Sequence, residues 1–260
     1  MVGASEAGRA RELIEGAERV TVLTGAGIST ESGIPDYRGP QGVWTRNPER
    51  EKLSTIDNYV ADPEVRKEVW RFRLEHEAWD AQPNDGHRAL VDLESAGKLH
   101  LLVTQNVDGL HHLAGTSPDR VVEVHGTIRE AMCLSCGDRM PMQDALDRVR
   151  GGEHDPHCMD CGGLLKSATI SFGQALIEQD LRRAQAGAEA CDLFLAIGTS
   201  LQVFPVAYLP GIALDAGAGL IVINAEPTPY DDAAAVVLRE RIGEVLPGLV
   251  ADLAAERGRA

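Results

Sequence analysis

Two pairs of cysteines form the most specific chemical pattern in this sequence. Cys133 and Cys136 make one C-x-x-C motif, and Cys158 and Cys161 make a second one further along the chain. Each motif directs two thiolates toward one point, and four thiolates satisfy the tetrahedral coordination of Zn²⁺. A full shell of four cysteines leaves no position for water or substrate, so the spacing predicts a structural zinc site.

The surroundings of these motifs narrow the interpretation. His154 and His157 lie beside the second pair and are rival ligands, which we interpret as bystanders. Residues 129–166 hold 5 basic and 7 acidic side chains, which is not the positive footprint of a DNA-binding zinc ribbon. The chain has 5 cysteines, an odd number that does not suggest a disulfide framework. The remaining one, Cys191, is expected to be a buried apolar thiol.

A glycine-rich turn follows the first apolar run of the chain. Residues 25–29 read Gly-Ala-Gly-Ile-Ser, and the two glycines would let the backbone approach a phosphate. A tight strand–helix turn is the alternative, because Thr30 stands where a full G-x-G-x-x-G fingerprint has its last glycine. The acidic residue that dehydrogenases carry about 20 residues later is missing from residues 46–50, which look like a loop. A standard hydride-transfer domain is therefore disfavoured.

Polar groups that could bind a nucleoside follow other apolar runs. Gln105, Asn106 and Asp108 offer two amides and a carboxylate, which suit ribose hydroxyls and carboxamides. An ordinary helix cap by Asn106 or Asp108 is the alternative. His125 follows the next run and is a candidate general base, because an imidazole has a pKa near neutrality. Residues 224–226 could supply a ribose-binding carboxylate or form an ordinary turn.

These polar groups need a scaffold, and the apolar pattern indicates one. Short, continuous apolar runs suit strands that are covered on both faces, so the pattern predicts an α/β fold with a doubly wound parallel sheet. In such sheets ligands bind beyond the carboxyl ends of the strands, where the polar groups fall. The expected strands are residues 19–24, 99–104, 121–124, 193–197 and 220–223, and the expected helices are about 62–80, 87–96 and 177–187.

Two segments do not fit this alternation. Residues 40–81 are polar, loop-rich and then helical, and residues 129–166 hold the cysteine pairs with no convincing strand–helix unit. We interpret both as parts of a smaller, helical and zinc-binding domain, separated from the larger domain by a cleft. The predicted boundaries are residues 1–39, 82–128 and 167–260 for the larger domain, and 40–81 and 129–166 for the smaller one.

Composition excludes several classes of protein. The chain has 260 residues, a formal charge of −15 and a sequence pI near 4.9, which argues against binding phosphate backbones. Hydrophobic residues make up 43%, enough for a sizeable core, whereas aromatic residues make up only 4%. No stretch approaches the roughly 20 apolar residues of a membrane helix. We expect a cytoplasmic protein with no direct nucleic-acid or membrane partner, although its acidity could attract basic peptides.

Taken together, the motifs closely resemble those of the sirtuins, the NAD-dependent protein lysine deacylases. The resemblance extends from about Gly25 to Leu246 and covers nearly the whole chain. Several uncommon motifs occur in the family's order, so chance is a poor explanation. They are residues 25–29, 33–38, 104–111, 124–126, both cysteine pairs, 172–173, 198–201 and 223–226.

The resemblance implies a Rossmann-like NAD-binding domain, a small zinc-binding and helical domain, and a cleft that takes NAD and an acyl-lysine peptide. It implies that residues 36–38 lie on a loop that closes over NAD. Asp108 would bind the nicotinamide carboxamide, and Gln105 and Asn106 the nicotinamide ribose. The implied NAD-binding residues are Gly25, Ala26, Gly27, Ser29, Pro35, Asp36, Tyr37, Arg38, Trp44, Gln105, Asn106, Val107, Asp108, His125, Gly198, Thr199, Ser200, Asn224, Ala225, Glu226 and Ile242.

The resemblance also implies the reaction, in which the acetyl group of acetyl-lysine passes to ADP-ribose and nicotinamide is released. His125 and Asn106 would be catalytic, with His125 as general base for a ribose hydroxyl. Zn²⁺, on Cys133, Cys136, Cys158 and Cys161, would take no chemical part. The peptide would enter as an extended strand against Ile170, Phe172, Gly173 and Val203. Deacylation of other acyl-lysines, protein mono-ADP-ribosylation and a catalytically silent NAD sensor are the alternatives.

Some positions depart from the family's usual pattern. Tyr37 stands where phenylalanine is usual and is expected to keep an aromatic wall. Residues 166–168 and Gln174 depart from the usual sequence beside the peptide groove, which bears on substrate preference. The desuccinylating branch carries Tyr-x-x-Arg on a helix of the small domain, and residues 70–76 lack that tyrosine. We expect Arg71 and Arg73 to be solvated on the helix exterior, and acetyl-lysine to be preferred over dicarboxylic acyl-lysines.

Overall fold

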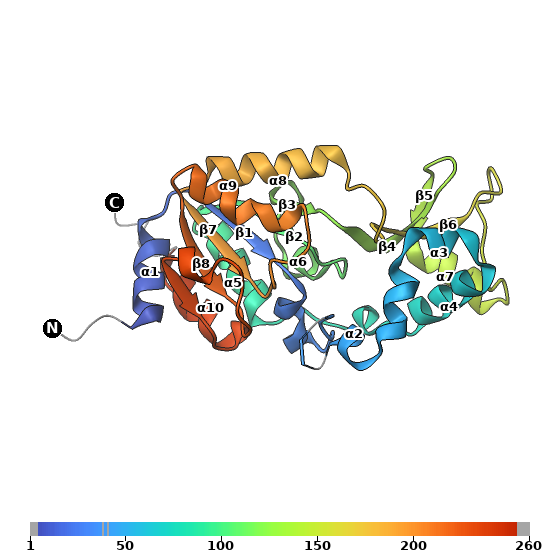
Figure 1. The fold of residues 1–260 in the computed structure, drawn as a ribbon, viewed down its shortest axis with the longest axis horizontal. Helices are drawn as coiled ribbons and strands as arrows, with labels where there is room; N and C mark the ends of the chain where they lie inside the picture. Colours follow the sequence, from blue (N-terminus) through green and yellow to red (C-terminus); the bar gives the residue numbers. More distant parts are fainter. Residues whose placement is uncertain (1–4, 38, 41, 254–260) are drawn as a thin grey trace.

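The computed structural model describes residues 5–37, 39–40 and 42–253. Its larger part is a six-stranded sheet in the order β3-β2-β1-β7-β8-β9 (Figure 1). Every neighbouring pair is parallel, which confirms the predicted fold class. The strands are β1 (Val20–Thr24), β2 (Leu99–Thr104), β3 (Val121–Glu123), β7 (Leu193–Ile197), β8 (Gly219–Ile223) and β9 (Val236–Leu238). The short edge strand β9 escaped prediction.

Helices cover both faces of this sheet, which explains the continuous apolar runs. Every residue of the central strands β1 and β7 is buried. One face packs against α1 (Glu6–Gly16), α5 (Asp85–Ser95) and α10 (Ile242–Val250), and the other against α8 (Glu178–Ala190) and α9 (Leu209–Asp215) (Figure 1). As expected, Cys191 is buried, and its Sγ lies 3.2 Å from the Ala188 carbonyl oxygen.

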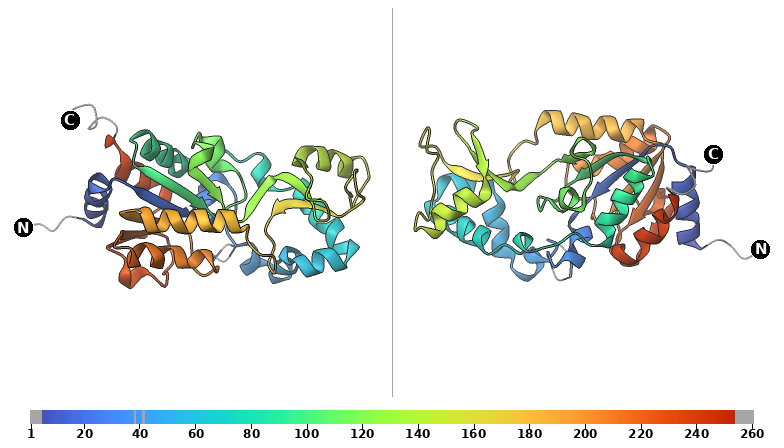
Figure 2. Two further views of the ribbon diagram at one scale, coloured as in Figure 1. Left: turned by 90° about the horizontal axis from the view of Figure 1, so that it is seen from above. Right: turned by 180° about the vertical axis from the view of Figure 1, so that it is seen from behind.

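A second, antiparallel sheet with the order β5-β4-β6 lies at the other end of the long axis (Figure 2). Strand β4 connects the two regions, because it begins just past the end of β3. Two of the predicted domain boundaries, after residues 128 and 166, fall inside β4 and β6, and the division into domains stays a prediction. The elements here are β4 (Gly126–Cys133), β5 (Arg139–Pro141), β6 (Leu165–Thr169), α2 (Val43–Arg46), α3 (Ile56–Ala61), α4 (Pro63–Leu74) and α7 (Met142–Arg150).

Residues 129–166 therefore contain more regular structure than we expected. The interpretation that they hold no strand–helix unit is wrong, because they include β5, α7 and most of β4. Strand β4 mixes buried residues with partly buried ones and has no continuous apolar run. Its stability comes from pairing with β6, for example Ala131 with Ser167, which is a contact that no local pattern reveals.

The helical predictions differ from the structure mainly at the ends. Residues 62–80 form α4 and then a separate 3₁₀ turn, Glu77–Trp79. Asp62 caps α4 by accepting a hydrogen bond of 2.8 Å from the Glu64 backbone N–H. The glycine-rich turn opens a 3₁₀ helix rather than an α-helix, and Gly33 ends it with a φ of 86°. The remaining helices are α6 (Leu110–Ala114) and the 3₁₀ helices Ala26–Ser32, Pro48–Ser54, Pro118–Arg120, Val206–Tyr208 and Asp231–Ala233.

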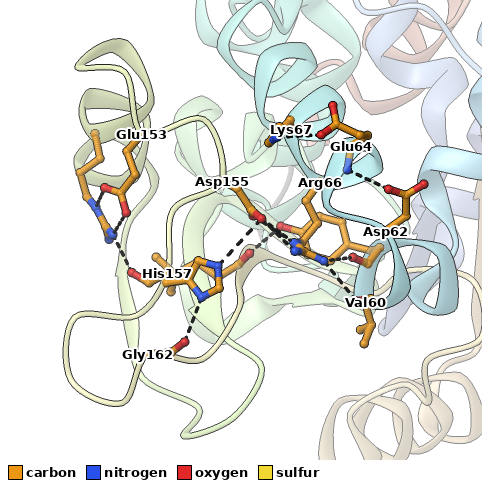
Figure 3. Close-up of polar contacts among 12 residues, drawn as sticks. Val60, Asp62, Glu64, Arg66, Lys67, Glu153, Asp155, His157 and Gly162 are labelled. Atoms are coloured by element: carbon orange, nitrogen blue, oxygen red, sulfur yellow. Dashed lines mark hydrogen bonds and ion pairs between the residues drawn. The ribbon is translucent and has the colours of Figure 1, made fainter.

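A buried ion pair joins the two halves of the smaller region (Figure 3). Arg66 on α4 donates from Nε to both carboxylate oxygens of Asp155, at 3.0 and 2.9 Å. The same guanidinium donates from Nη1 to the Tyr59 and Val60 carbonyl oxygens. Only 8% of the Arg66 side chain and 15% of the Asp155 side chain are exposed. The pair therefore holds the loop before Cys158 against the helices α3 and α4.

None of the helices in the described part of the chain is long and apolar enough to span a bilayer.

Candidate functional site

The parallel sheet brings distant segments together at one edge. Main-chain hydrogen bonds join the residues just past the strands: Gly25 N–H donates to the Ile197 carbonyl oxygen at 3.0 Å, and Gln105 N–H donates to the Thr24 carbonyl oxygen at 3.0 Å. The strand order reverses between β1 and β7, and crevices for ligands form at such switch points. Strands β1, β2, β3, β7 and β8 all end at this edge, and the predicted NAD-binding segments begin there.

The glycines after β1 have a packing role that the sequence did not reveal. A Cβ on Gly25 would lie 2.7 Å from the Gly198 carbonyl oxygen, and a Cβ on Gly27 would lie 2.7 Å from the Gly198 Cα. Gly198 itself has a φ of 62°, which side chains rarely adopt. The loops after β1 and β7 approach each other so closely that only glycine fits at these positions. The tight-turn alternative therefore accounts for the glycines, and no bound phosphate is needed to explain them.

A buried hydrogen-bond network connects the segments after β1 and β2. The Ser29 hydroxyl donates to Asp108 Oδ2 at 2.7 Å, and Asn106 Nδ2 donates to Ser29 Oγ at 3.1 Å. Asn106 Nδ2 also lies 3.1 Å from the Gly25 carbonyl oxygen. All three side chains belong to residues that are at most 8% exposed. The network holds an amide and a carboxylate in fixed positions at the edge of the sheet.

Asp108 combines the two roles that the sequence left open. Its Oδ1 accepts a hydrogen bond of 2.9 Å from the Leu110 N–H at the start of α6, as a helix cap does. Its Oδ2 belongs to the network with Ser29. Burial raises the pKa of Asp108, and the hydrogen bonds from Leu110 and Ser29 and the nearby Arg129 guanidinium oppose that rise.

His125 is held in one tautomer. Its Nδ1 lies 3.0 Å from the Gln105 carbonyl oxygen, which can only accept, so Nδ1 carries the proton and Nε2 carries the basic lone pair. Burial lowers the pKa of His125, and the bond to the Gln105 carbonyl opposes this. The Gln105 side chain in turn donates to Thr199 Oγ1 at 2.8 Å, which ties β2 to β7. The imidazole is therefore a neutral base near neutral pH.

An aromatic row borders this edge. The rings of Tyr37 and Trp44 lie 4.7 Å apart, and those of Trp44 and Phe172 lie 5.4 Å apart. The expected aromatic wall at Tyr37 is therefore present, with 41% of that residue exposed. Asp36 closes its loop by accepting a hydrogen bond of 2.8 Å from the Gly39 N–H. The predicted NAD contact Arg38 lies outside the described residues.

The predicted peptide-binding segment is held by main-chain hydrogen bonds and leads into a turn, in which Gln174 N–H donates to the Ser171 carbonyl oxygen at 3.0 Å. Ile170 N–H donates to the His125 carbonyl oxygen at 2.8 Å, so this segment is fastened to the candidate base. Phe172 N–H donates to the Ser54 carbonyl oxygen at 2.8 Å. Gly173 follows with a φ of 87°. Phe172 remains 39% exposed, and Val203, in the loop after β7, is partly buried.

Residues after β8 behave more like an ordinary turn. Asn224 Nδ2 donates to the Glu226 carbonyl oxygen at 2.8 Å, and Glu226 itself is exposed. Ile242 is 8% exposed and belongs to the core on one face of the sheet. The other predicted residues lie at the same edge: Pro35 and Ala225 are exposed, Ala26, Val107 and Ser200 are partly buried, and Gly198 and Thr199 are buried.

The four paired cysteines lie together, as their spacing predicted. Their sulfur atoms all lie within 4.8 Å of one another, and the Cys133–Cys161 and Cys136–Cys158 distances are 3.5 and 3.8 Å. A tetrahedron with Zn–S bonds of about 2.3 Å has sulfur atoms roughly 3.8 Å apart, so the cluster fits Zn²⁺. Hydrogen bonds from the backbone N–H of Cys136 and Ser135 lower the pKa of Cys133, whereas the neighbouring thiols raise the pKa of Cys136, so only a bound cation would favour the thiolate form of all four.

The neighbouring histidines lie outside the cluster. His157 Nδ1 donates to the Gly162 carbonyl oxygen at 2.9 Å, so its ring supports the loop between Cys158 and Gly163 (Figure 3). His154 is exposed and is not among the grouped ligand atoms of the described residues. This arrangement agrees with the interpretation of both histidines as bystanders.

Arg73 and Lys166 differ from expectation. Arg73 is not a solvated exterior residue: its Nη2 donates to Ser167 Oγ at 3.0 Å, and burial lowers its pKa. Lys166 and Ser167 are 2% and 5% exposed, so they are interior residues rather than surface residues of a peptide groove. Burial, and then the Arg73 charge, lower the pKa of Lys166 to about 7. The missed signal was helical spacing, because Arg73 lies on the face of α4 that carries the buried residues Arg66 and Trp70.

Comparisons with known proteins identify similar chains. The Sir2 family model matches residues 25–205. An "NAD-dependent protein deacetylase 2" of Streptomyces coelicolor is 53% identical over 234 residues, covering 90% of this chain and 97% of that protein.

Solved structures agree with the sequence matches. One described as "Structural Basis for the Mechanism and Regulation of Sir2 Enzymes" has a TM-score of 0.86 and 37% identity, over 97% of this chain and 99% of that chain. A "Sir2-p53 peptide-NAD+" structure has a TM-score of 0.80 and 32% identity, and the match covers 96% of this chain and 97% of that chain.

Proposed function

This chain belongs to the Sir2 family and is an NAD-dependent protein deacetylase, and we propose that it deacetylates lysine side chains of proteins or peptides with His125 as the general base. The observation that carries this role is the fixed tautomer of His125. Its Nδ1 is occupied by the Gln105 carbonyl oxygen, so the proton it removes must go to Nε2. When bound, NAD supplies the ADP-ribose that accepts the acetyl group.

The polar network beside His125 supports proposed roles in binding. Asn106 and Gln105 would hold the nicotinamide ribose, and Asp108 would accept a hydrogen bond from the nicotinamide carboxamide. Their burial favours these roles, because hydrogen bonds are stronger where water is excluded. The segments after β1, β7 and β8 would bind the phosphates and the adenosine half.

The smaller region has a proposed structural role. Its four thiolates would hold Zn²⁺ and complete the fold around β4 to β6. An acetyl-lysine peptide would enter as an extended strand beside residues 170–173, where main-chain hydrogen bonds would give affinity with modest sequence selectivity. The net charge of −15 favours basic peptide partners and disfavours direct nucleic-acid binding, and we propose a cytoplasmic location.

A direct assay tests the proposed chemistry. We would incubate the protein with NAD and an acetyl-lysine peptide, and identify O-acetyl-ADP-ribose by mass spectrometry. His125→Ala should lower deacetylation about 10²–10⁴-fold, as loss of a positioned base does. His100→Ala, in the first half of β2, is the matched control and should retain activity. A peptide that gains the mass of ADP-ribose would instead indicate mono-ADP-ribosylation, and binding without turnover would indicate a sensor.

The pH dependence of activity tests the state of His125. Because burial lowers its pKa below the usual 6.5, the neutral base is already formed at neutral pH. Activity should fall only on acidification, with the midpoint of the kcat/KM profile below pH 6.5. A midpoint above that value would contradict the assignment.

A further inference from the structure

Arg129 occupies the point where three segments of the chain meet. It lies on β4, the strand that connects the two sheets. Its Nε donates to the Asp108 carbonyl oxygen at 3.0 Å, and its Nη2 donates to the Ala78 carbonyl oxygen at 3.2 Å. Its guanidinium carbon also lies 5.4 Å from the centre of the Trp79 ring, within cation–π range. One side chain thus connects β4, the loop after β2 and the 3₁₀ turn Glu77–Trp79.

Two residues of β4 donate hydrogen bonds to the loop that carries Asp108. On one side, the Asp108 carboxylate is held by Ser29. On the other side, Ile128 N–H donates to the Val107 carbonyl oxygen at 2.9 Å, and Arg129 binds the next carbonyl. Gly109 has a φ of 75°, and a Cβ there would lie 3.1 Å from Arg129 Nε. The backbone and the guanidinium are therefore closely packed.

Arg129 holds main-chain groups rather than a carboxylate. In the described part of the chain, no carboxylate oxygen lies within 4.0 Å of its guanidinium nitrogens, although Asp108 and Glu123 attract the charge at longer range. Two directed bonds to carbonyl oxygens fix the position of a peptide, whereas an ion pair would chiefly offset charge. This geometry is suited to positioning.

The second carbonyl that Arg129 binds belongs to a well-fixed segment. Residue 78 lies in the turn that leads from α4 toward α5, and Ala78 is fully buried. The Trp79 indole N–H donates to the Arg73 carbonyl oxygen at 2.6 Å, which fastens the turn to the end of α4. Arg129 therefore ties the Asp108 loop to a rigid part of the smaller region.

We propose that Arg129 is a positioning residue for the nicotinamide half of NAD: it fixes the Asp108 peptide and links it to the turn after α4. The proposal rests on the proposed role of Asp108 as the partner of the nicotinamide carboxamide. It names a residue that acts through Asp108 and touches neither substrate. The effect should be selective for nicotinamide, because ADP-ribose keeps the ribose that Asn106 would hold but lacks the carboxamide that Asp108 would bind.

Two variants and a matched control test this proposal. Arg129→Met keeps an apolar stem over Trp79 but removes both donors, and Arg129→Lys keeps the charge with different geometry. The control is Arg139→Met, because Arg139 is an exposed arginine of the same sheet whose Nη1 pairs with Glu130 at 2.7 Å. For Arg129→Met we expect the KM for NAD, and the nicotinamide concentration that halves activity, to rise about tenfold, the scale of a charged hydrogen bond. The dissociation constant of ADP-ribose should change by less than about twofold, and Arg129→Lys should restore part of the loss.

A cavity permits a chemical test of the same idea. It has a volume of about 450 Å³, opens to solvent and is lined by Gly109, Glu123 and Arg129, among others. In the Arg129→Ala variant, added methylguanidinium should enter this space and lower the KM for NAD again. Equal concentrations of ethylammonium, which lacks the planar donors, should rescue less.

A double-variant cycle decides whether Arg129 acts through Asp108. In an Asp108→Asn background, Arg129→Met should add little to the loss in nicotinamide inhibition, because the group that it positions has already been changed. An Arg129→Met protein with unchanged KM and unchanged nicotinamide inhibition would overturn the proposal. So would an equal weakening of ADP-ribose binding, which would indicate a general structural role. A wild-type protein without deacetylase activity would count against the proposed function instead.

Discussion

The cysteine cluster and the polar network at the sheet edge are organised by different means. The cysteine cluster brings four thiols within 4.8 Å, a geometry that a bound cation stabilises and that mutual repulsion of thiolates opposes. In the sheet-edge network, Ser29, Asn106 and Asp108 satisfy one another by hydrogen bonds, and the protein alone holds them. Damage to the cluster should therefore act on folding, whereas damage to the network should act on NAD chemistry.

The two regions are not independent, because β4 belongs to both. It carries Cys133 at one end and Arg129, which binds the Asp108 carbonyl oxygen, near the other. The buried Arg66–Asp155 pair joins the zinc loop to the helices of the smaller region. Substitutions in one region can therefore test whether β4 transmits a loss of stability or of NAD binding to the other.

The largest expected effect comes from Cys158→Ser. Structural zinc contributes about 10–16 kcal/mol in small zinc domains, so loss of one ligand should release the metal and unfold the region around β4–β6. The parallel sheet should remain folded and should still bind ADP-ribose. Zinc analysis, circular dichroism and calorimetric titration with ADP-ribose measure these outcomes.

The double variant His154→Ala, His157→Ala is the control for this experiment. It should keep its zinc, because neither imidazole belongs to the sulfur cluster. Loss of zinc from it would contradict the assignment of four cysteine ligands.

Arg66→Met should give the next largest loss. The Asp155 side chain is only 15% exposed, and the substitution removes the cation that pairs with it. Breaking a buried ion pair in this way lowers the free energy of unfolding by about 3–5 kcal/mol. Lys67→Met is the control, because Lys67 pairs with Glu64 on the surface and its replacement should change the free energy of unfolding much less than that of Arg66. Urea unfolding measures both. Equal losses would show that the buried pair has no special role.

In the sheet-edge network, Ser29→Ala should have a moderate effect on stability. It removes the donor to Asp108 and the acceptor for Asn106, so about 1–3 kcal/mol of the free energy of unfolding should be lost. The KM for NAD should rise in the same variant, and zinc content should stay constant. The control is Ser5→Ala, at the exposed N-cap of α1, which should leave the KM unchanged. Loss of zinc from Ser29→Ala would break the distinction between the two regions.

The smallest expected effect concerns the acyl group. Acetyl-lysine peptides should exceed matched succinyl-lysine peptides in kcat/KM by at least about tenfold, or roughly 1.4 kcal/mol. A succinyl carboxylate needs a charged partner, and the Arg73 guanidinium is already bonded to Ser167. Equal or reversed kcat/KM values would contradict this expectation. If Arg73→Met then removed the activity on the succinyl-lysine peptide, Arg73 would be shown to bind the acyl chain.

Much of the fold followed from local patterns in the sequence. The strand predicted over residues 193–197 matches β7, because a run of five apolar residues buried on both faces has few alternatives. Strand β4 and helix α7 were not predicted. Strand β4 has no continuous apolar run and depends on pairing with β6. Helix ends near Gly33 and Asp62 follow local capping, although the 3₁₀ form of the first helix was not predicted.

The candidate site divides in the same way. The cysteine pairs could be recognised from the sequence because each pair is a local turn with a fixed spacing. Hydrogen bonds between Asn106 and Ser29, 77 residues apart, and between Gln105 and Thr199, 94 residues apart, have no local signal. The interior position of Lys166 was likewise hidden, because β6 is buried only when α4 packs over it.

The sequence by itself determined the parallel sheet, the four-cysteine cluster and the family, since all three depend on residue types at short spacing. Only the tertiary structure decided the tautomer of His125, the bond of Arg73 to Ser167 and the bonds of Arg129 to the Asp108 and Ala78 carbonyl oxygens. These features depend on which distant backbone groups meet a side chain. A hydrogen bond needs a partner at about 3 Å, and only the folded chain brings those partners together.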